Sequence, residues 1–287
     1  MRALQDVGAD DLILKDRASL DLTRQQEVDD FFRADRPRVV VFAAARVGGI
    51  LANKSFPAEF ILQNLTMAVN VVQAAIRTGA QRLLYMGSTC AYPANARQPI
   101  CESELLNGPL ETSNEAYAVA KLAGIKLCQH VRAQHGLVYH TVMPTNLYGP
   151  GDRYDAAASH VIPALIQRFH EAKIRQADSV SIWGTGRQLR DFLHVDDLAN
   201  AVLKLLQTAN PPDVVNVGSG REISVRDLAE LIADVVGFCG EITTDETQPE
   251  GVTRKLADTR RIESLGWRPE VPLRDGLAGA YQDFLSR

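Results

Sequence analysis

Short apolar segments alternate along the chain with longer amphipathic segments. The apolar segments have the length of buried strands and lie at residues 12–14, 39–42, 82–86 and 138–142. The segments between them repeat apolar residues at the spacing of one helix face. This alternation predicts an α/β fold in which helices cover both faces of a parallel sheet.

Several helix boundaries can be predicted from residues that start or stop helices. The segment Thr23-Arg24-Gln25-Gln26 has the form of a capping box and predicts a helix that ends near Pro37. Further helices are expected at residues 57–79 and 114–136, because the first opens with a proline and both end at a glycine.

The pattern becomes less regular after Gly149-Pro150-Gly151. A short strand is expected at residues 179–183, and helices are expected near residues 195–206 and 224–236. We therefore expect residues 1–150 to form one region and residues 151–287 a smaller one, some of whose strands and helices return to the first. A cleft between the two regions is the expected ligand site.

Composition and charge exclude several classes of protein. A formal net charge of −4 without a basic stripe argues against a nucleic-acid partner. The chain has no apolar run of about 18 residues and no signal-peptide core at its start, so a cytoplasmic protein without a membrane partner is expected. The four cysteines are widely spaced, so neither a disulfide framework nor a metal site is expected.

The strongest chemical signal is the pair Tyr117 and Lys121. A spacing of four residues places both side chains on one face of a helix. A nearby ammonium favours the phenolate, so Lys121 can bring Tyr117 toward proton transfer at neutral pH. Such a pair also occurs by chance in helices, with a packed tyrosine and a solvated lysine, and so requires further support.

That support comes from the segment Met86-Gly87-Ser88-Thr89-Cys90, which follows an apolar strand. Its hydroxyl residues lie at the carboxyl end of the strand, the side on which such folds bind ligands. Ser88 or Thr89 can therefore hydrogen-bond a substrate carbonyl. The strand-end serine followed by Tyr117 and Lys121 resembles the catalytic triad of the short-chain dehydrogenases/reductases, which transfer hydride between a nicotinamide and a carbonyl or alcohol.

Further segments make the resemblance more specific, and they occur in order through nearly the whole chain. Within the extended branch of that family, the chain resembles the GDP-L-fucose synthases. The matching segments are residues 43–50, 87–90, 114–117, 143–150, 159–164, 183–186, 190–197 and 254–258.

The resemblance implies a Rossmann-like doubly wound parallel sheet, in which residues 1–150 bind NADP(H) and residues 151–287 mainly bind a GDP-sugar. It also implies the epimerisation of GDP-4-keto-6-deoxy-D-mannose at C3 and C5, followed by reduction of the C4 ketone with NADPH. Cys90 and His160 match the two proton-transfer positions of the family. Taken alone, Cys90 can be a small buried side chain and His160 a surface histidine.

The other site residues are also implied by the resemblance. Ser88 would position the substrate, Tyr117 would protonate the C4 oxygen and Lys121 would tune Tyr117. The cofactor would be bound by Arg17, Ala43, Ala44, Lys121, Asn146, Leu147 and His160, and the substrate by Arg168, Trp183, Arg190 and Lys255. Arg17 favours NADP over NAD, because a basic residue suits the 2′-phosphate. The relatives are homodimers that join through two long helices, here within residues 57–78 and 114–135.

The phosphate-binding start of the expected fold is not found in this sequence. No apolar strand with a Gly-x-Gly-x-x-Gly turn precedes residue 12, and Gly48-Gly49 follows a later strand with the wrong spacing. We therefore expect the first strand to be missing and the strands beside it to lack ladder partners.

Two other functions are compatible with these residues. Another nucleotide-sugar epimerase or dehydratase would keep Ser88, Tyr117 and Lys121, but Cys90 and His160 argue against it. A catalytically silent sugar-nucleotide-binding protein without cofactor would explain the absent glycine-rich turn. The remaining histidines carry no expected chemistry: His130, His135 and His140 are expected on helix or strand surfaces, and His170 and His194 have no acid–base companion.

Overall fold

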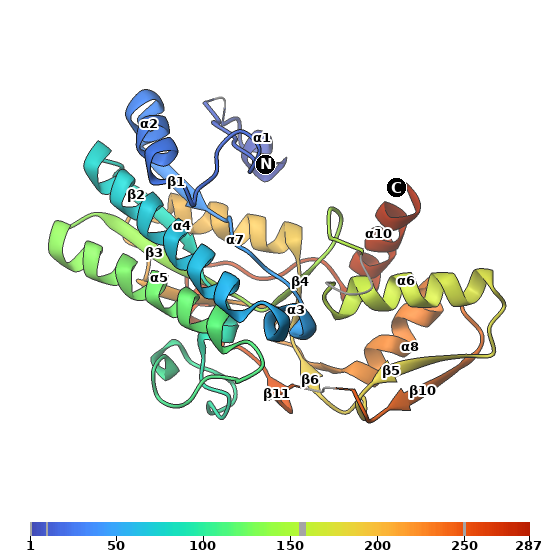
Figure 1. Cartoon of the computed structure of the whole chain (residues 1–287). Coiled ribbons are helices and arrows are strands. Elements are labelled where there is room, and N and C mark those ends of the chain that lie inside the picture. Colours follow the sequence, from blue (N-terminus) through green and yellow to red (C-terminus); the bar gives the residue numbers. More distant parts are fainter. Residues whose placement is uncertain (1, 10, 155–158, 249–250) are drawn as a thin grey trace.

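A parallel sheet of four strands, in the order β1-β2-β3-β8, forms the centre of the larger part of the molecule. The computed structural model describes residues 2–9, 11–154, 159–248 and 251–287. Figure 1 shows the sheet between the helix pair α4 and α5 on one side and α7 on the other. The predicted α/β fold with a parallel sheet is confirmed.

The helices and strands alternate through the first half of the chain and become shorter afterwards. The helices are α1 (Arg2–Asp6), α2 (Gln25–Asp35), α3 (Ile50–Ser55), α4 (Pro57–Thr78), α5 (Glu115–His135), α6 (Val161–Ile174), α7 (Val195–Gln207), α8 (Val225–Val236), α9 (Arg260–Ser264) and α10 (Leu273–Leu285). The strands are β1 (Val39–Phe42), β2 (Arg82–Met86), β3 (Val138–Pro144), β4 (Asn146–Tyr148), β5 (Ser179–Trp183), β6 (Leu189–Arg190), β7 (Phe192–His194), β8 (Val214–Val217), β9 (Ile223–Ser224), β10 (Glu241–Asp245) and β11 (Arg254–Lys255). Two 3-10 turns, η1 (Thr89–Ala91) and η2 (Glu102–Glu104), lie between β2 and α5.

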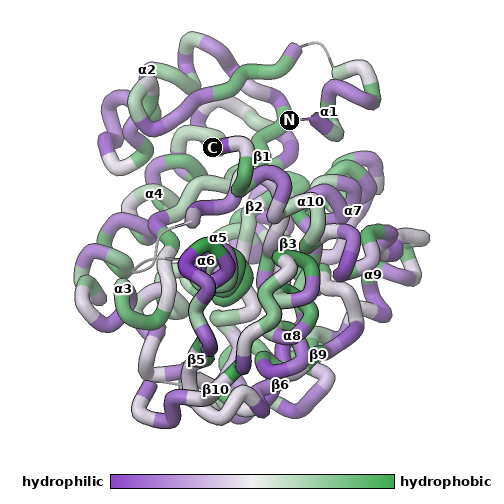
Figure 2. The backbone as a smooth tube through the Cα atoms, turned by 90° about the vertical axis from the view of Figure 1, so that its right-hand side faces the viewer, coloured by the Kyte–Doolittle hydropathy of each residue, from purple (hydrophilic) through white to green (hydrophobic). Residues whose placement is uncertain are grey.

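Each face of the sheet packs against its own layer of helices. On one face, Leu83 and Tyr139 pack against apolar residues of α2, α4 and α5. On the other, Leu84 and Val142 pack against α7, α9 and Trp267. Successive residues of a strand point to opposite faces of the sheet. Alternate residues of each strand therefore pack against one helix layer, and the residues between them pack against the other. Figure 2 shows how green hydrophobic and purple hydrophilic stretches alternate along the chain.

A second apolar core lies outside the sheet, among α6, α8, α10 and the strand β5. Figure 1 shows these elements together on the right side of the molecule. The strand β5 pairs with β10 in parallel, and β6 pairs with β11 and β9. Residues beyond 150 also return to the first core, since β8 joins the sheet and α7 covers it. The division of the chain at residue 150 stays a prediction.

Most predicted elements are confirmed by the structure. The helices α4 and α5 end at Gly79 and Gly136, both in the left-handed conformation that stops helices. The strand β5 and the helices α7 and α8 also lie where they were expected. The capping box was wrong: α2 begins after Arg24 without a side-chain cap, and the Thr23 hydroxyl donates instead to Asp21.

The strand expected at residues 12–14 does not form. Ile13 and Leu14 are about half exposed, and no ladder hydrogen bonds hold this segment. Among the described residues, β1 is the last strand at its side of the sheet, and Val39 and Val41 are 51% and 38% exposed. A strand forms only where a neighbour accepts and donates its backbone hydrogen bonds, and residues 12–14 have none beside them.

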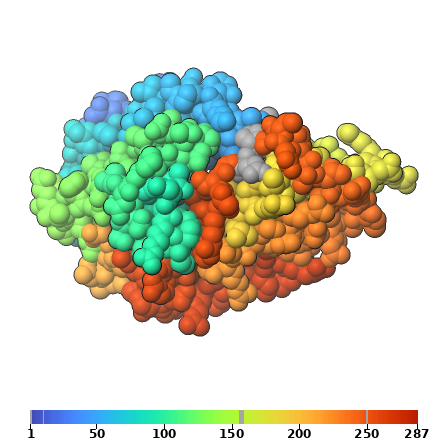
Figure 3. Space-filling model, turned by 90° about the horizontal axis from the view of Figure 1, so that it is seen from below, coloured from blue at the N-terminus to red at the C-terminus, as the bar shows by residue number. Residues whose placement is uncertain are grey.

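The two parts of the molecule are joined by a contact between segments far apart in the sequence. Ile100 donates its backbone N–H to Leu256 at 2.8 Å and forms a bridge with Ala257. Figure 3 shows the teal-green segment around residue 100 beside an orange-red segment of the last fifth of the chain. This contact brings β11 close to the end of β2. No helix in the described residues is long and apolar enough to cross a membrane.

Candidate active site

A cavity of about 520 Å³ opens at the carboxyl ends of β2 and β3. Its walls come from the loops after β1 and β2, the first turns of α5, the strand β4 and residues near β11. Parallel sheets bind ligands at this edge because the loops after the strands converge there. Ten of the predicted site residues line this cavity: Ala43, Ser88, Cys90, Tyr117, Lys121, Asn146, Leu147, His160, Arg190 and Lys255.

Ser88 and Cys90 are positioned by a tight turn that follows β2. Gly87 is buried against β3, and a Cβ atom there would lie 2.6 Å from the Met143 sulfur. Any larger residue here would push against the Met143 and Thr141 side chains of β3. The hydroxyl of Ser88 then accepts a hydrogen bond from the backbone N–H of Cys90 at 3.2 Å, which fixes the start of η1. Cys90 is only half-buried and its thiol is free.

Tyr117 and Lys121 lie one turn apart on α5, with the Lys121 ammonium 5.8 Å from the centre of the Tyr117 ring. Lys121 is buried, and burial lowers its pKa to about 8, while negative charge at Cys90 acts in the opposite direction. Burial also raises the pKa of Tyr117, as does negative charge at Cys90, and a hydrogen bond with Ser88 opposes these effects. Cys90 therefore acts on both Tyr117 and Lys121, and Ser88 acts on Tyr117.

The position of α5 depends on its close contact with β2. At Gly124, an added Cβ atom would lie 2.5 Å from the hydroxyl of Tyr85. The absence of a side chain therefore lets the helix approach the sheet directly. This contact lies one turn after Lys121, so it holds the tyrosine and the lysine over the carboxyl end of the strand.

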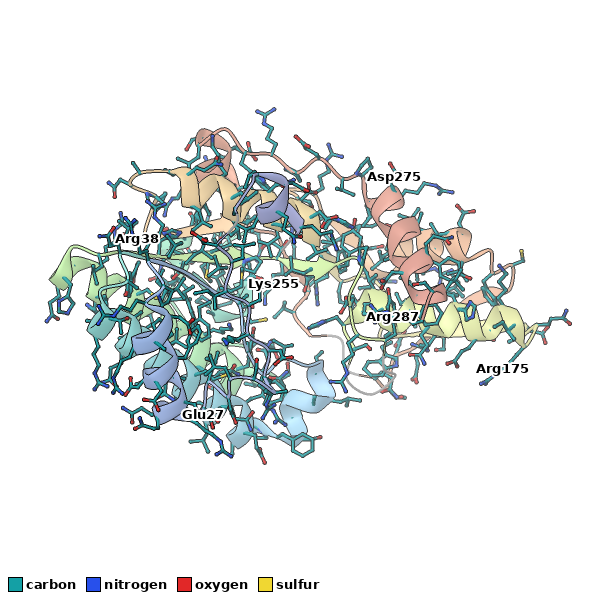
Figure 4. The ribbon with its side chains drawn as sticks, turned by 90° about the horizontal axis from the view of Figure 1, so that it is seen from above. Glu27, Arg38, Arg175, Lys255, Asp275 and Arg287 are labelled. Carbon is teal, nitrogen blue, oxygen red and sulfur yellow. The ribbon has the colours of Figure 1, made fainter. Side chains whose placement is uncertain are left out.

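Arg190 and Lys255 enter the cavity from neighbouring strands. They are partners in the parallel pairing of β6 with β11, so they lie side by side at this wall. The Lys255 ammonium lies 4.0 Å from the Cys90 sulfur. Figure 4 shows Lys255 in the middle of the molecule, between labelled surface residues such as Glu27 and Arg175. Two cations side by side can bind a diphosphate.

Asn146 is tied to a buried acidic residue that lies between β6 and β7. Its backbone N–H and its side-chain amide both donate to the backbone carbonyl of Asp191, at 3.2 and 3.0 Å. The Asp191 carboxylate itself accepts hydrogen bonds from Ser219 and is fully buried, and burial raises its pKa. Asn146 is thus held rigidly beside Leu147 at the cavity wall.

Comparison with known proteins agrees with this arrangement. Residues 2–218 match the NAD dependent epimerase/dehydratase family. The chain is 53% identical over 283 residues to a probable GDP-L-fucose synthase 1 of Oryza sativa subsp. japonica, covering 98% of this chain and 86% of that protein.

The chain belongs to the NAD dependent epimerase/dehydratase family, and within it to the GDP-L-fucose synthases.

Solved structures of related proteins share the whole fold of this GDP-L-fucose synthase family member. A GDP-6-OMe-4-keto-L-xylo-heptose reductase from C. jejuni is 31% identical, with a TM-score of 0.92, over 99% of this chain and 93% of that one. A GDP-L-fucose synthetase from Naegleria fowleri, bound to NADP, is 25% identical, with a TM-score of 0.89, over 99% and 90%.

Four of the residues expected in a GDP-L-fucose synthase site lie outside the cavity lining. Arg17 and Ala44 are both exposed, the latter in the loop after β1. Arg168 donates a hydrogen bond to the carbonyl of Ser181, and burial lowers its pKa. Trp183 is 37% exposed at the end of β5. Their roles in binding stay predictions.

His160 joins the cavity from the start of α6, the helix whose N-cap it forms. It is exposed, in contrast to Cys90 on the loop after β2. The two side chains come from different parts of the chain, and both line the same cavity. Among the other histidines, His140 was expected at a surface but is fully buried in β3. That expectation was wrong because β3 is covered on both faces.

Several polar residues of this site were not predicted from the sequence, among them Asn53, Glu111, Ser113 and Asn114. Asn53 donates to the carbonyls of Gly48 and Gly49, at 2.8 and 3.1 Å, and so holds the loop after β1. Its carbonyl oxygen is buried without a partner in the described structure. An asparagine at a core position of an amphipathic helix was the available signal, since such an amide needs hydrogen bonds.

Proposed function

We propose that this protein catalyses the NADPH-dependent conversion of GDP-4-keto-6-deoxy-D-mannose to GDP-L-fucose, by epimerisation at C3 and C5 followed by reduction at C4. The observation that carries the proposal is the convergence of Ser88, Cys90, Tyr117, Lys121 and His160 on one cavity. The first, third and fourth suit a carbonyl reduction, and the other two suit a proton exchange on carbon. The names of the relatives support the same reaction.

The cavity fits the nicotinamide end of an NADP(H) cofactor. The buried Asn53 carbonyl oxygen has no partner among the described residues, so a polar group is available at its wall. Lys121, Asn146, Leu147 and Ala43 would lie against that end of the cofactor. When bound, NADPH supplies the hydride for C4. Arg17 is proposed to contact the 2′-phosphate, which agrees with the NADP present in the Naegleria fowleri relative.

In the epimerisation, the proposed base and acid are Cys90 and His160. The C4 ketone acidifies the protons at C3 and C5, so loss of either proton gives an enolate. One residue removes the proton from one face of the ring and the other returns a proton to the opposite face. Their placement on different elements, η1 and the start of α6, is compatible with such an exchange.

In the reduction, Tyr117 is the proposed donor of a proton to the C4 oxygen. A phenol whose pKa is raised by burial keeps its proton in the resting site, which is the state a proton donor needs. Ser88 orients the same oxygen through its hydroxyl. Lys121 supplies positive charge that favours the phenolate after the proton has left.

The diphosphate of the substrate is proposed to bind Arg190 and Lys255, which are paired across β6 and β11. Guanidinium and ammonium groups both bind phosphate oxygens, and the guanidinium does so with two parallel hydrogen bonds. Arg168 and Trp183 would extend this surface toward the nucleotide. Neither lines the cavity, so contact with them would need a substrate that reaches beyond its mouth.

We further propose a cytoplasmic homodimer joined through α4 and α5. The helix α4 exposes Leu62 and Val69, which are 63% and 50% accessible to solvent. These two side chains lie seven residues apart and hence on the same face of the helix. A symmetric pairing of α4 and α5 with their copies would cover this face. Sedimentation of the purified protein tests this proposal.

The test of the proposed function is a product analysis in heavy water. The protein is incubated with GDP-4-keto-6-deoxy-D-mannose and NADPH, and the product is identified by NMR. The expected product is GDP-L-fucose with deuterium at C3 and C5. Reduction without deuterium uptake would overturn the proposal in favour of a simple C4 reductase, the activity named for the C. jejuni relative.

A further inference from the structure

Lys255 is the cation nearest to the Cys90 thiol among the contacts that the structure describes. Its ammonium lies 4.0 Å from the Cys90 sulfur, and both side chains are half-buried in the same cavity wall. The pairing brings together two residues 165 positions apart in the sequence. The contact between residues 98–101 and 254–258 holds this arrangement, because it attaches β11 to the loop that carries Cys90.

Two of the cations near Lys255 are neutralised by carboxylates. Arg254 forms a bidentate ion pair with Glu222, with nitrogen–oxygen distances of 2.7 and 2.9 Å. Arg260 forms an ion pair with Asp258. Within the part of the chain that the structure describes, no carboxylate pairs with Lys255. Its charge is therefore available to the thiol beside it.

Other titratable groups also face Cys90. Tyr117 and Lys121 reach it from α5, and both interact with its charge. Glu111, Asp152, His160 and Arg190 line the same cavity. The Lys121 ammonium is already used in a hydrogen bond to the Met86 carbonyl, whereas that of Lys255 has the thiol as its described partner.

We propose that Lys255 stabilises the thiolate of Cys90 and thereby prepares it to remove the proton in epimerisation. A thiolate, and not a thiol, is both the base and the nucleophile, and an adjacent lysine raises the fraction in that form. Lys255 acts here as a positioning residue, in addition to its proposed contact with the diphosphate. The inference rests on the proposed function only where it assigns proton removal to Cys90.

The test is alkylation of the substrate-free protein with iodoacetamide at neutral pH, read for each cysteine by peptide mass spectrometry. Lys255→Met should slow the labelling of Cys90 about tenfold, because less thiolate is present. Lys255→Arg, which keeps the charge, should restore most of the rate. The exposed Cys239 serves as the internal reference, since its labelling should be the same in all variants.

Two further measurements separate an effect on the ionisation of the Cys90 thiol from an effect on its accessibility to the reagent. At strongly alkaline pH every accessible thiol ionises, so the Cys90 labelling rates of the wild type and Lys255→Met should converge. Lys54→Met removes an exposed lysine of α3 outside the cavity lining and should leave Cys90 unchanged. An unchanged Cys90 rate in Lys255→Met, or a gap that persists at alkaline pH, would overturn the inference. Because no substrate is present, either outcome leaves the proposed function to be judged by its own product analysis.

Discussion

The Lys121 ammonium donates a hydrogen bond to the backbone carbonyl of Met86 at 2.7 Å. This bond joins the helix that carries Tyr117 to the end of the strand that leads into Ser88 and Cys90. It also explains how a lysine can be only 3% exposed to solvent, because the ammonium keeps one strong acceptor. The same side chain is thus a structural link and the source of positive charge in the site.

Lys121 should make the stability of the protein change with pH in the alkaline range. The ordinary pKa of a lysine is 10.5, and burial lowers that of Lys121 to about 8 in the folded protein. Between these values the unfolded chain binds more protons than the folded one, so stability rises with pH. Relative to Lys121→Met, the wild type should gain up to about 3 kcal/mol between pH 8 and 10.5. Urea unfolding of both proteins at several pH values measures this, and parallel curves would contradict it.

Cys90→Ser and Tyr117→Phe should impair different steps of the reaction. Each substitution removes one proton-transfer group, which is typically worth a factor of about 10² to 10⁴ in rate. Cys90→Ser should slow deuterium uptake at C3 and C5, whereas Tyr117→Phe should slow oxidation of NADPH and leave the uptake. The two readouts can be followed in one reaction by NMR and absorbance. Equal loss of both readouts in both variants would argue against separate roles.

His140 should sensitise the fold to acid. It is fully buried, neither ring nitrogen has a partner in the described structure, and burial, followed by Arg132 and Arg82, lowers its pKa to about 3. Below about pH 6.5 the unfolded chain binds this proton and the folded chain does not, so stability falls by about 1.4 kcal/mol per pH unit until about pH 3.

His140→Leu should remove this component of the acid sensitivity. The variant should unfold at a lower pH than the wild type, as followed by circular dichroism. His130→Gln, at an exposed position of α5, is the control for loss of a histidine. An acid midpoint of His140→Leu equal to that of the wild type would refute the assignment to His140.

Gly124→Ala should destabilise the protein and disturb the site together. The added methyl group would meet the Tyr85 hydroxyl at 2.5 Å, so α5 must move away from β2. Overpacking of this kind typically costs about 1–3 kcal/mol. Gly279→Ala in α10 is the matched control, because nothing lies within 4 Å of its Cβ position, and it should stabilise the helix by up to about 1 kcal/mol. Thermal unfolding of both variants gives the comparison.

Arg17→Ala should weaken the preference for NADPH over NADH. A guanidinium at this position can pair with the 2′-phosphate, which NADH lacks. The expected result is a KM for NADPH that rises about tenfold, with little change for NADH. Steady-state kinetics with the two cofactors measure this. An equal change in the KM for NADPH and for NADH would show that Arg17 supports the fold and does not bind the 2′-phosphate.

Three of the four strands of the sheet, β1, β2 and β3, could be predicted because each has a local signal, whereas β8 was not predicted. Apolar runs predict β2 and β3, and Pro57, Gly79 and Gly136 predict helix boundaries without knowledge of the fold. Residues 12–14 carry the same kind of apolar run, yet they form no strand. A strand forms only if an adjacent strand supplies its hydrogen-bond partners, and a local sequence pattern does not show whether such a strand is present.

Resemblance to the GDP-L-fucose synthases was needed to assign proton exchange to Cys90 and His160. Part of the chemistry can be read from the amino acids alone: a tyrosine and a lysine one helical turn apart, and a strand-end serine. Local spacing settles the first of these because the two side chains lie within one helix. The folded structure determines which of these residues share a cavity. Folding places Lys255 beside Cys90, buries His140, and keeps Arg168 and Trp183 outside the cavity lining. Those relationships depend on the packing of segments far apart in the chain, which no local pattern contains.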